Sequence, residues 1–173
     1  AIIDRWVIST VLAWLETHQT RLPNTQFIGV NLSGGSLNDM SFIESLFELL
    51  EGHGEVAKRL CIEITETVAL TDLAHMQRFI ERAGALGVKV ALDDFGAGYS
   101  RLSSLKRLSV DTLKLDRSYV QGMLGDAQDL SLVEGVIGLA RNIGCAVLAK
   151  GVESRAHARE LLRLGCRLGQ GNG

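Results

Sequence analysis

The sequence has few of the features that mark secreted, membrane-spanning or polymer-binding proteins. Its 173 residues include one proline, and no apolar run approaches the roughly 18 residues of a membrane span. The net charge of −2 argues against a nucleic-acid polymer as partner, although a small anionic nucleotide would still be a suitable ligand. Cys61, Cys145 and Cys166 lie in apolar segments without C-x-x-C spacing, which predicts reduced thiols rather than zinc ligands. With no targeting segment at Ala1–Val7, we expect a cytoplasmic domain, which a longer parent protein could still anchor to a membrane.

Apolar residues make up 46% of the chain, enough for one globular domain with a sizeable core. Helical and strand-like patterns alternate along the sequence, which predicts βα units and an α/β fold with a parallel sheet. The expected helices cover residues 2–18, 40–52, 71–86, 101–108, 128–143 and 154–164. The expected strands cover residues 26–32, 59–64, 88–93, 112–115, 145–149 and 166–169.

The expected strands carry polar residues at their ends, and the position of these residues favours a barrel over an open sheet. In a barrel, the carboxyl ends of successive strands meet at one rim. In an open sheet, the same residues would be spread along an edge, and only those near a switch point would share a ligand. The residues are Asn31, Glu63, Asp93, Asp94, Lys114 and Lys150.

The paired acids Asp93 and Asp94 follow an apolar run and precede the glycine-rich loop 95–100. Such a pair at a strand end predicts a divalent metal site, while the alternative is an acidic loop that caps the next helix. Asn31 could supply a neutral oxygen ligand or form an Asx turn. Glu63 alternates with apolar neighbours, so its buried carboxylate needs a metal or a cation, which makes it a strong ligand candidate.

Lys114 interrupts its strand in the same way, and a buried lysine needs anionic partners. Carboxylates on neighbouring strands would provide them, and the lysine could then orient an attacking water or neutralise a phosphate oxygen. Glu66 follows the strand that contains Glu63. It could cap the next turn, or it could hold the loop 93–100 through backbone amides.

Four segments together identify a family resemblance that covers essentially the whole chain. The segments VNLSG, IEITET, LDDFGAGYSRLSSLKRLSVDTLKLDRSYV and AKGVES closely resemble those of the EAL domains, which hydrolyse the bacterial second messenger cyclic di-GMP. The resemblance implies a modified (β/α) barrel of the TIM type, of which residues 1–173 would be the larger part. By the same resemblance, we expect the first strands and the last helix of that barrel to lie outside residues 1–173.

The resemblance also implies a set of site residues and a cofactor. The family uses Mg²⁺ or Mn²⁺ to cut one phosphodiester bond and release linear pGpG. The resemblance therefore implies that two hard cations generate the hydroxide that attacks the phosphate. The implied metal ligands are Asn31, Glu63, Asp93 and Asp94. The implied catalytic residues are Lys114, Asp94, Glu66 and Gln170, and the implied ligand-binding residues are Asn31, Ser33, Asp116 and Glu153.

Two departures from the family pattern bear on activity. The Glu-Ala-Leu tripeptide, whose glutamate is a metal ligand in the family, does not occur in the sequence. Lys150 stands where the family has a glutamate, and an ammonium beside a dication is repulsive, so Lys150 should displace the second metal. Two functions therefore stay open: a cyclic di-GMP phosphodiesterase, and a degenerate domain that binds the dinucleotide as a receptor or regulatory module.

The resemblance extends to partners of the domain. Besides cyclic di-GMP, we expect a linked GGDEF-type or sensor domain in the parent protein. Leu102, Leu105 and Leu108 recur at intervals of three residues, a spacing that fits core packing or a two-fold interface. On the second interpretation, the domain would form a homodimer.

Overall fold

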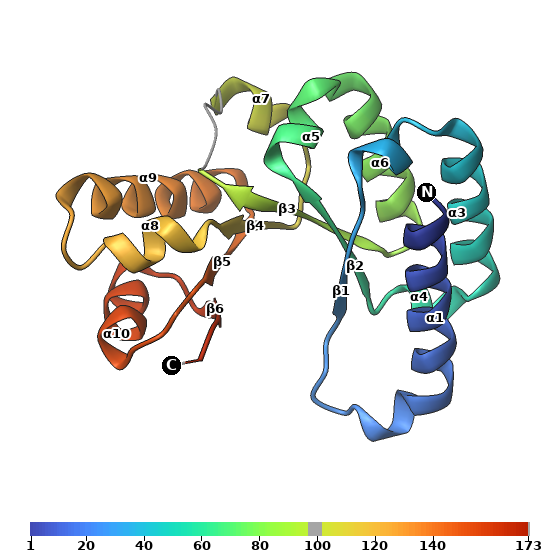
Figure 1. The fold of residues 1–173 in the computed structure, drawn as a ribbon, viewed down its shortest axis with the longest axis horizontal. Coiled ribbons are helices and arrows are strands. Elements are labelled where there is room, and N and C mark those ends of the chain that lie inside the picture. Colours follow the sequence, from blue (N-terminus) through green and yellow to red (C-terminus); the bar gives the residue numbers. More distant parts are fainter. Residues whose placement is uncertain (97–101, 173) are drawn as a thin grey trace.

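The computed structural model describes residues 1–96 and 102–172, and at residues 102 and 103 it describes the backbone alone. Six parallel strands form one sheet in the order β1-β2-β3-β4-β5-β6. The sheet curls into a half-barrel (Figure 1), which confirms the predicted α/β fold of the incomplete TIM-like type. The strands are β1 (Ile28–Asn31), β2 (Leu60–Thr65), β3 (Lys89–Phe95), β4 (Thr112–Leu115), β5 (Ala146–Lys150) and β6 (Leu168–Gln170).

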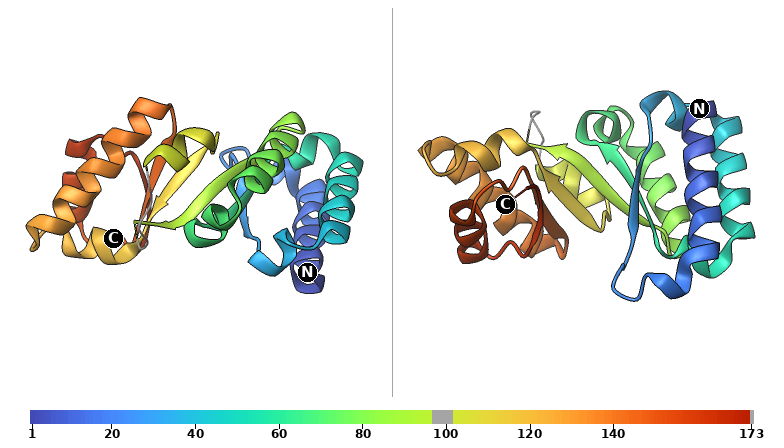
Figure 2. Two further views of the ribbon diagram at one scale, coloured as in Figure 1. Left: turned by 90° about the horizontal axis from the view of Figure 1, so that it is seen from above. Right: turned by 60° about the horizontal axis from the view of Figure 1, so that its bottom comes forward.

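Helices connect successive strands, because a parallel strand can be reached only by a crossover. In two orientations, α1, α3 and α6 lie together at one end of the sheet and α8, α9 and α10 at the other (Figures 1 and 2). The longer helices are α1 (Ile2–His18), α3 (Met40–Gly52), α6 (Leu73–Ala85), α9 (Ala127–Ile143) and α10 (Arg155–Leu164). The shorter ones are the 3₁₀ turn η1 (Gln19–Arg21), α2 (Gly34–Leu37), α4 (Gly54–Ala57), α5 (Glu66–Thr71), α7 (Leu102–Arg107) and α8 (Arg117–Gly122).

Helix ends follow from local side chains. Asp72 caps α6 by accepting from the His75 amide at 3.1 Å, and Ser154 caps α10 by accepting from the His157 amide at 3.2 Å. At the other end, α9 and α10 stop at Gly144 and Gly165, whose φ values of 74° and 97° are left-handed. Glycine adopts this conformation without a Cβ clash, so the chain can leave the helix and enter the next strand.

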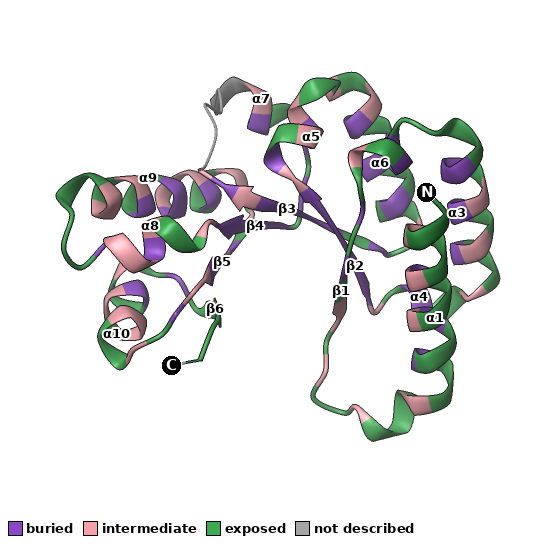
Figure 3. Cartoon of the chain, in the orientation of Figure 1, coloured by how far each residue is buried: buried purple, intermediate pink, exposed green. Residues whose placement is uncertain are grey.

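The core lies between the strands and the inner faces of the helices (Figure 3). The interior strand β2 is buried along almost its whole length, as expected for a parallel strand covered by helices. Leu105 and Leu108 are also buried. Core packing, not a two-fold interface, therefore explains both residues, while the Leu102 side chain is outside the described part of the chain. The thiols of Cys61 and Cys166 are buried, and that of Cys145 is partly exposed.

The structure differs from the sequence prediction mainly in β3 and in the short helices. We predicted that this strand ends at Asp93, but it continues through Asp94 to Phe95. The short helices α2, α4, α5 and α8 were not predicted, since one or two turns give too little periodicity to recognise. In the described ranges, no helix combines the length and apolarity that crossing a membrane would require.

Candidate functional site

The candidate site lies where the parallel strands end, at their carboxyl edge. The strand register places Asn31 beside Glu63 on β1 and β2, and Lys150 beside Gln170 on β5 and β6. Because all six strands run in the same direction, their polar end residues reach a common edge of the curled sheet. We call this set the rim: Asn31, Glu63, Asp93, Asp94, Lys114, Lys150 and Gln170.

Glu63 and Lys114 form a buried ion pair within the rim. Each residue is less than a tenth exposed, and Lys114 Nζ donates a hydrogen bond to Glu63 Oε1. The two strands that carry them are separated by β3, so the pair spans the inside of the curled sheet. A buried charge without its partner is strongly unfavourable, so each side chain depends on the other.

Lys150 pairs with both aspartates of β3. Its Nζ lies 2.8 Å from Asp93 Oδ1 and 2.9 Å from Asp94 Oδ1. Burial acts to lower the pKa of Lys150, but the hydrogen bonds and the charges of the two aspartates outweigh it, so the pKa is raised above its ordinary value. The ammonium group is therefore firmly charged at neutral pH.

A bulge in β3 brings both aspartates to the same ammonium. Between the register pairs Leu92–Leu113 and Phe95–Leu115, Asp93 and Asp94 face the single residue Lys114. Asp94 also has a left-handed backbone with φ of 52°, and its amide donates to Asp93 Oδ1 at 2.8 Å. In a regular strand, two successive side chains would point to opposite faces. The extra residue of a bulge redirects a side chain, and here it allows Lys150 to contact both carboxylates.

Glu66 contacts the loop that follows β3. Glu66 is almost fully buried at 3% exposure, and its Oε2 accepts from the Gly96 amide at 3.2 Å. This is a contact of the kind expected for a residue that holds the loop. Residues 97–101 of the loop lie outside the described residues.

The other predicted site residues have exposed or capping positions. Asn31, Glu153 and Gln170 are exposed. Asp116 caps α8 by accepting from the Ser118 amide at 2.8 Å and the Ser118 hydroxyl at 3.0 Å. Ser33 caps α2, accepting from the Ser36 amide at 3.2 Å. These contacts cap the two helices, and the ligand-binding roles of both residues stay predictions.

Two residues that support the rim were not predicted. A Cβ at Gly29 would lie 2.2 Å from Glu63 Oε1, so the absence of a side chain leaves the space that the Glu63 carboxylate fills. A glycine inside a strand often marks such a close approach, and that signal was available in the sequence. Asp4 on α1 accepts from the Ser33 amide, the Ser33 hydroxyl and the Ser36 hydroxyl at 2.9, 2.7 and 2.6 Å. No local pattern indicates this contact.

The arrangement of the rim does not fit a metal ion at the Asp93–Asp94 pair. Over residues 1–96 and 102–172, no group of three or more histidine, cysteine, aspartate or glutamate side chains could hold one. The nearest cation to both aspartates is Lys150 itself. Metal binding by Asn31, Glu63, Asp93 and Asp94 therefore stays a prediction that this arrangement does not support.

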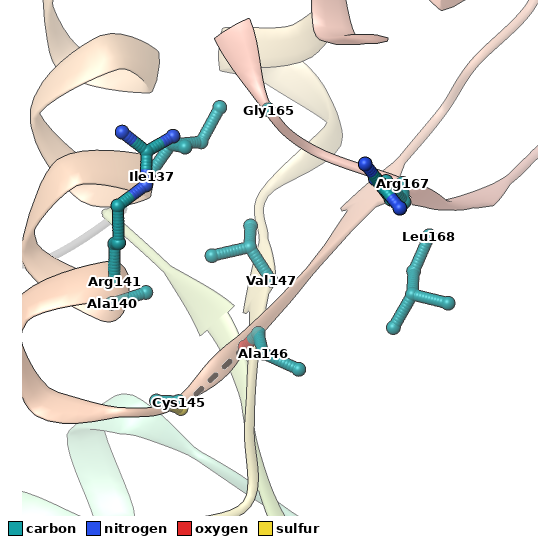
Figure 4. Close-up of a pocket in the computed structure, with 9 residues that line it drawn as sticks. All are labelled: Ile137, Ala140, Arg141, Cys145, Ala146, Val147, Gly165, Arg167 and Leu168. Atoms are coloured by element: carbon teal, nitrogen blue, oxygen red, sulfur yellow. Dashed lines mark hydrogen bonds between the residues drawn. The ribbon is translucent and has the colours of Figure 1, made fainter.

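A separate cavity of about 250 Å³ lies between α9, β5 and the segment before β6 (Figure 4). It is lined by apolar residues such as Ile137 and Val147, with Arg141 and Arg167 among its lining residues. Arg141 Nη2 donates to the Leu164 carbonyl at 3.4 Å, so its guanidinium group already binds the end of α10. None of the rim residues lines this cavity, so it does not belong to the candidate site.

Comparison with known proteins identifies the family. The sequence profile of the EAL domain matches residues 1–173. The chain belongs to the EAL domain family. Members that act as phosphodiesterases are generally dependent on a divalent metal.

Individual EAL proteins agree with this assignment. The chain is 35% identical over 144 residues to MucR of Pseudomonas aeruginosa, a bifunctional diguanylate cyclase and cyclic di-GMP phosphodiesterase. This match covers 83% of the chain and 21% of MucR, so the chain spans a small part of that relative.

Solved EAL structures have the same fold. The MucR phosphodiesterase in complex with cyclic di-GMP aligns with a TM-score of 0.90 and 32% identity, over 98% of this chain and 68% of that one. The EAL domain of Mycobacterium smegmatis DcpA aligns with a TM-score of 0.87 and 38% identity, over 98% of this chain and 76% of that one. These similarities place the curled sheet and its rim in an EAL fold.

Proposed function

We propose that this EAL chain binds cyclic di-GMP at the rim. One observation carries the proposal: the carboxyl ends of the strands bring the carboxylates and two lysines of the rim to one edge of the sheet. Ligands of α/β barrels bind at this edge. The similar MucR structure is a complex with cyclic di-GMP, which supports the same ligand for this chain.

The family reaction, cleavage of one phosphodiester bond to give linear pGpG, is the first candidate activity. Lys114 would then stabilise negative charge that develops on the phosphate, and Glu66 would hold the loop at Gly96. A divalent ion, Mg²⁺ or Mn²⁺, would supply activated hydroxide. Asp93 and Asp94 could hold such an ion only after Lys150 had left them, because the ammonium contacts both.

The second candidate is a receptor that binds the dinucleotide without cleaving it. The ion pairs of Lys150 with Asp93 and Asp94 favour this candidate, since they use carboxylates that hydrolysis would need. Nucleotide binding requires groups that recognise guanine and phosphate, which do not depend on water activation. Loss of hydrolysis with retained binding is therefore chemically consistent.

A binding measurement combined with a product assay separates the candidates. Isothermal titration of the intact protein with cyclic di-GMP should give saturable binding, which linear pGpG added at the same concentration should not reproduce. Chromatography after incubation with Mn²⁺ then shows whether pGpG accumulates. Product formation supports the phosphodiesterase and binding without product supports the receptor, whereas the absence of binding would overturn the proposed function.

The partners and location of the domain follow as further parts of the proposal. MucR combines its phosphodiesterase with a diguanylate cyclase, which supports a linked GGDEF-type or sensor domain here. Because Leu105 and Leu108 are buried in the core, they do not support a two-fold interface, and a homodimer stays a prediction that light scattering would test. A cytoplasmic location agrees with a nucleotide ligand made inside the cell.

A further inference from the structure

Lys150 is fixed at the rim by the backbone as well as by its ion pairs. It is the last residue of β5, where the register pairs it with Gln170, and the preceding Ala149 is fully buried beside Leu115. The Lys150 side chain is 24% exposed and that of Asp93 is 12% exposed. The ammonium group is therefore partly shielded from water, between the buried Asp93 and the half-exposed Asp94.

A metal ion and the Lys150 ammonium group would compete for these carboxylates. Hard divalent cations bind carboxylate oxygens at about 2.0–2.6 Å, and Asp93 Oδ1 already accepts a hydrogen bond from Lys150 at 2.8 Å. A protonated lysine has donors only, so it cannot join the ligand shell of a metal. A divalent ion at this pair would therefore be repelled by the ammonium group unless Lys150 moved away.

The charges of the rim are already nearly balanced. The carboxylates of Glu63, Asp93 and Asp94 contact the ammonium groups of Lys114 and Lys150. Asn31 and Gln170, beside them in the strand register, are neutral. With two of the three negative charges compensated from within the chain, the rim has little electrostatic drive to take up a divalent cation, whose affinity depends on the number of ligand charges.

We propose that Lys150 is a tethered cation that takes the place of a metal ion between Asp93 and Asp94, so that the rim is held together without a divalent ion. The inference deepens the proposed function, because it names the cation of the same site. Two donors of the ammonium group serve the aspartates, and a third is available to an anionic ligand. Phosphate recognition by this EAL domain would then be independent of metal.

The first test counts Mn²⁺ ions bound to the intact protein by electron paramagnetic resonance. With Lys150 in place, Asp93→Asn should leave the number of bound Mn²⁺ ions unchanged, since no ion lies at this pair. A lower number in Asp93→Asn than in the wild type would overturn the proposal. This comparison does not require any variant at position 150 to fold.

Variants at Lys150 test whether a metal ion binds at the aspartates once the ammonium group is removed. Lys150→Glu should bind additional Mn²⁺ at least about tenfold more tightly than the wild type, because a repulsive charge is replaced by a ligand, and adding Asp93→Asn should remove the gain. Lys150→Met should lower the melting temperature, and Mn²⁺ should partly restore it. Lys89→Glu is the matched control: it makes the same charge change on an exposed residue at the opposite end of β3, and it should gain no Mn²⁺. Equal gains in Lys150→Glu and Lys89→Glu would contradict the proposal.

A nucleotide measurement distinguishes failure of this inference from failure of the proposed function. The affinity of the intact protein for cyclic di-GMP should be the same with EDTA as with Mn²⁺. A large loss of affinity in EDTA would overturn the proposed role of Lys150 as the cation of the site, while leaving cyclic di-GMP binding established. If cyclic di-GMP does not bind under either condition, the proposed function fails, and the Mn²⁺ counts still decide the role of Lys150.

Discussion

Gly29 and Glu63 lie against each other on neighbouring strands, and a Cβ at Gly29 would come within 2.2 Å of Glu63 Oε1. The same oxygen accepts the hydrogen bond from Lys114. A residue without a side chain on β1 therefore determines where a charged pair between β2 and β4 can lie. Small residues beside a site can be as important for its geometry as the charged ones.

Gly29→Ala should move the Glu63 carboxylate and weaken its pairing with Lys114. We expect a loss of about 1–3 kcal/mol in the free energy of unfolding, as for other overpacked positions, together with weaker cyclic di-GMP binding. Denaturant unfolding and calorimetric titration would measure the two effects. Gly35→Ala is the control, because a Cβ there meets nothing within 4 Å; equal effects of the two substitutions would contradict the prediction.

Lys114→Met should leave the Glu63 carboxylate buried without its cation. We expect the free energy of unfolding to fall by about 3–5 kcal/mol, the range for one partner of a buried ion pair. Lys58→Met removes a lysine whose pairing with Glu55 is exposed, and it should cost less than about 1 kcal/mol. Adding Glu63→Gln should recover part of the loss in Lys114→Met, and a double-mutant cycle without coupling would refute the pairing.

The sequence predicted the order of the main helices and strands along the chain well, because each of these elements is recognised from local patterns. Apolar periodicity and local capping residues mark helix limits within a few positions. The helices expected over 71–86, 128–143 and 154–164 correspond to α6, α9 and α10, with ends that differ by two residues or fewer. The capping contacts involve neighbours along the chain, so a single sequence contains the necessary information.

The rim could be predicted only as a list of residues. Its pairings depend on side chains brought together from different strands, such as Lys150 with Asp93, which are 57 residues apart. The bulge at Asp93 and Asp94 is a property of the register between β3 and β4, which periodicity does not contain. We expected repulsion by Lys150 to act on a metal, whereas the structure shows attraction to the aspartates as the dominant contact.

Asp94 provides a test of backbone conformation that is separate from charge. Asp94→Ala and Asp94→Gly both remove the carboxylate, but alanine is disfavoured at a φ of 52°. We expect Asp94→Gly to be more stable than Asp94→Ala by about 1 kcal/mol in denaturant unfolding. At Ala146, in the regular strand β5, Ala→Gly should be destabilising instead. If glycine is less stable than alanine at position 94 as well as at position 146, the left-handed conformation of Asp94 imposes no constraint.

Asp4 should make the stability of the chain sensitive to acid. Burial acts to raise the pKa of its carboxyl group, but hydrogen bonds from Ser36 and Ser33 outweigh this, so the pKa is lowered from its ordinary value of 3.8. A carboxylate with a lowered pKa stabilises the folded state above its unfolded pKa, and this contribution disappears as the pH falls through its folded pKa.

Asp4→Asn should therefore cost about 1–2 kcal/mol at neutral pH, toward the low end of the ~1.5–3 kcal/mol for hydrogen bonds to a charged group because Asp4 is partly exposed, and the cost should shrink below pH 3.8. Unfolding free energies of wild type and variant, measured over a pH series, would show the two curves converging in acid. Ser36→Ala should move the curve in the same direction by less, since two of the three hydrogen bonds to Asp4 persist. A constant difference between wild type and Asp4→Asn at every pH would mean that the carboxylate charge contributes nothing, and that Asp4 holds the turn before α2 by shape alone.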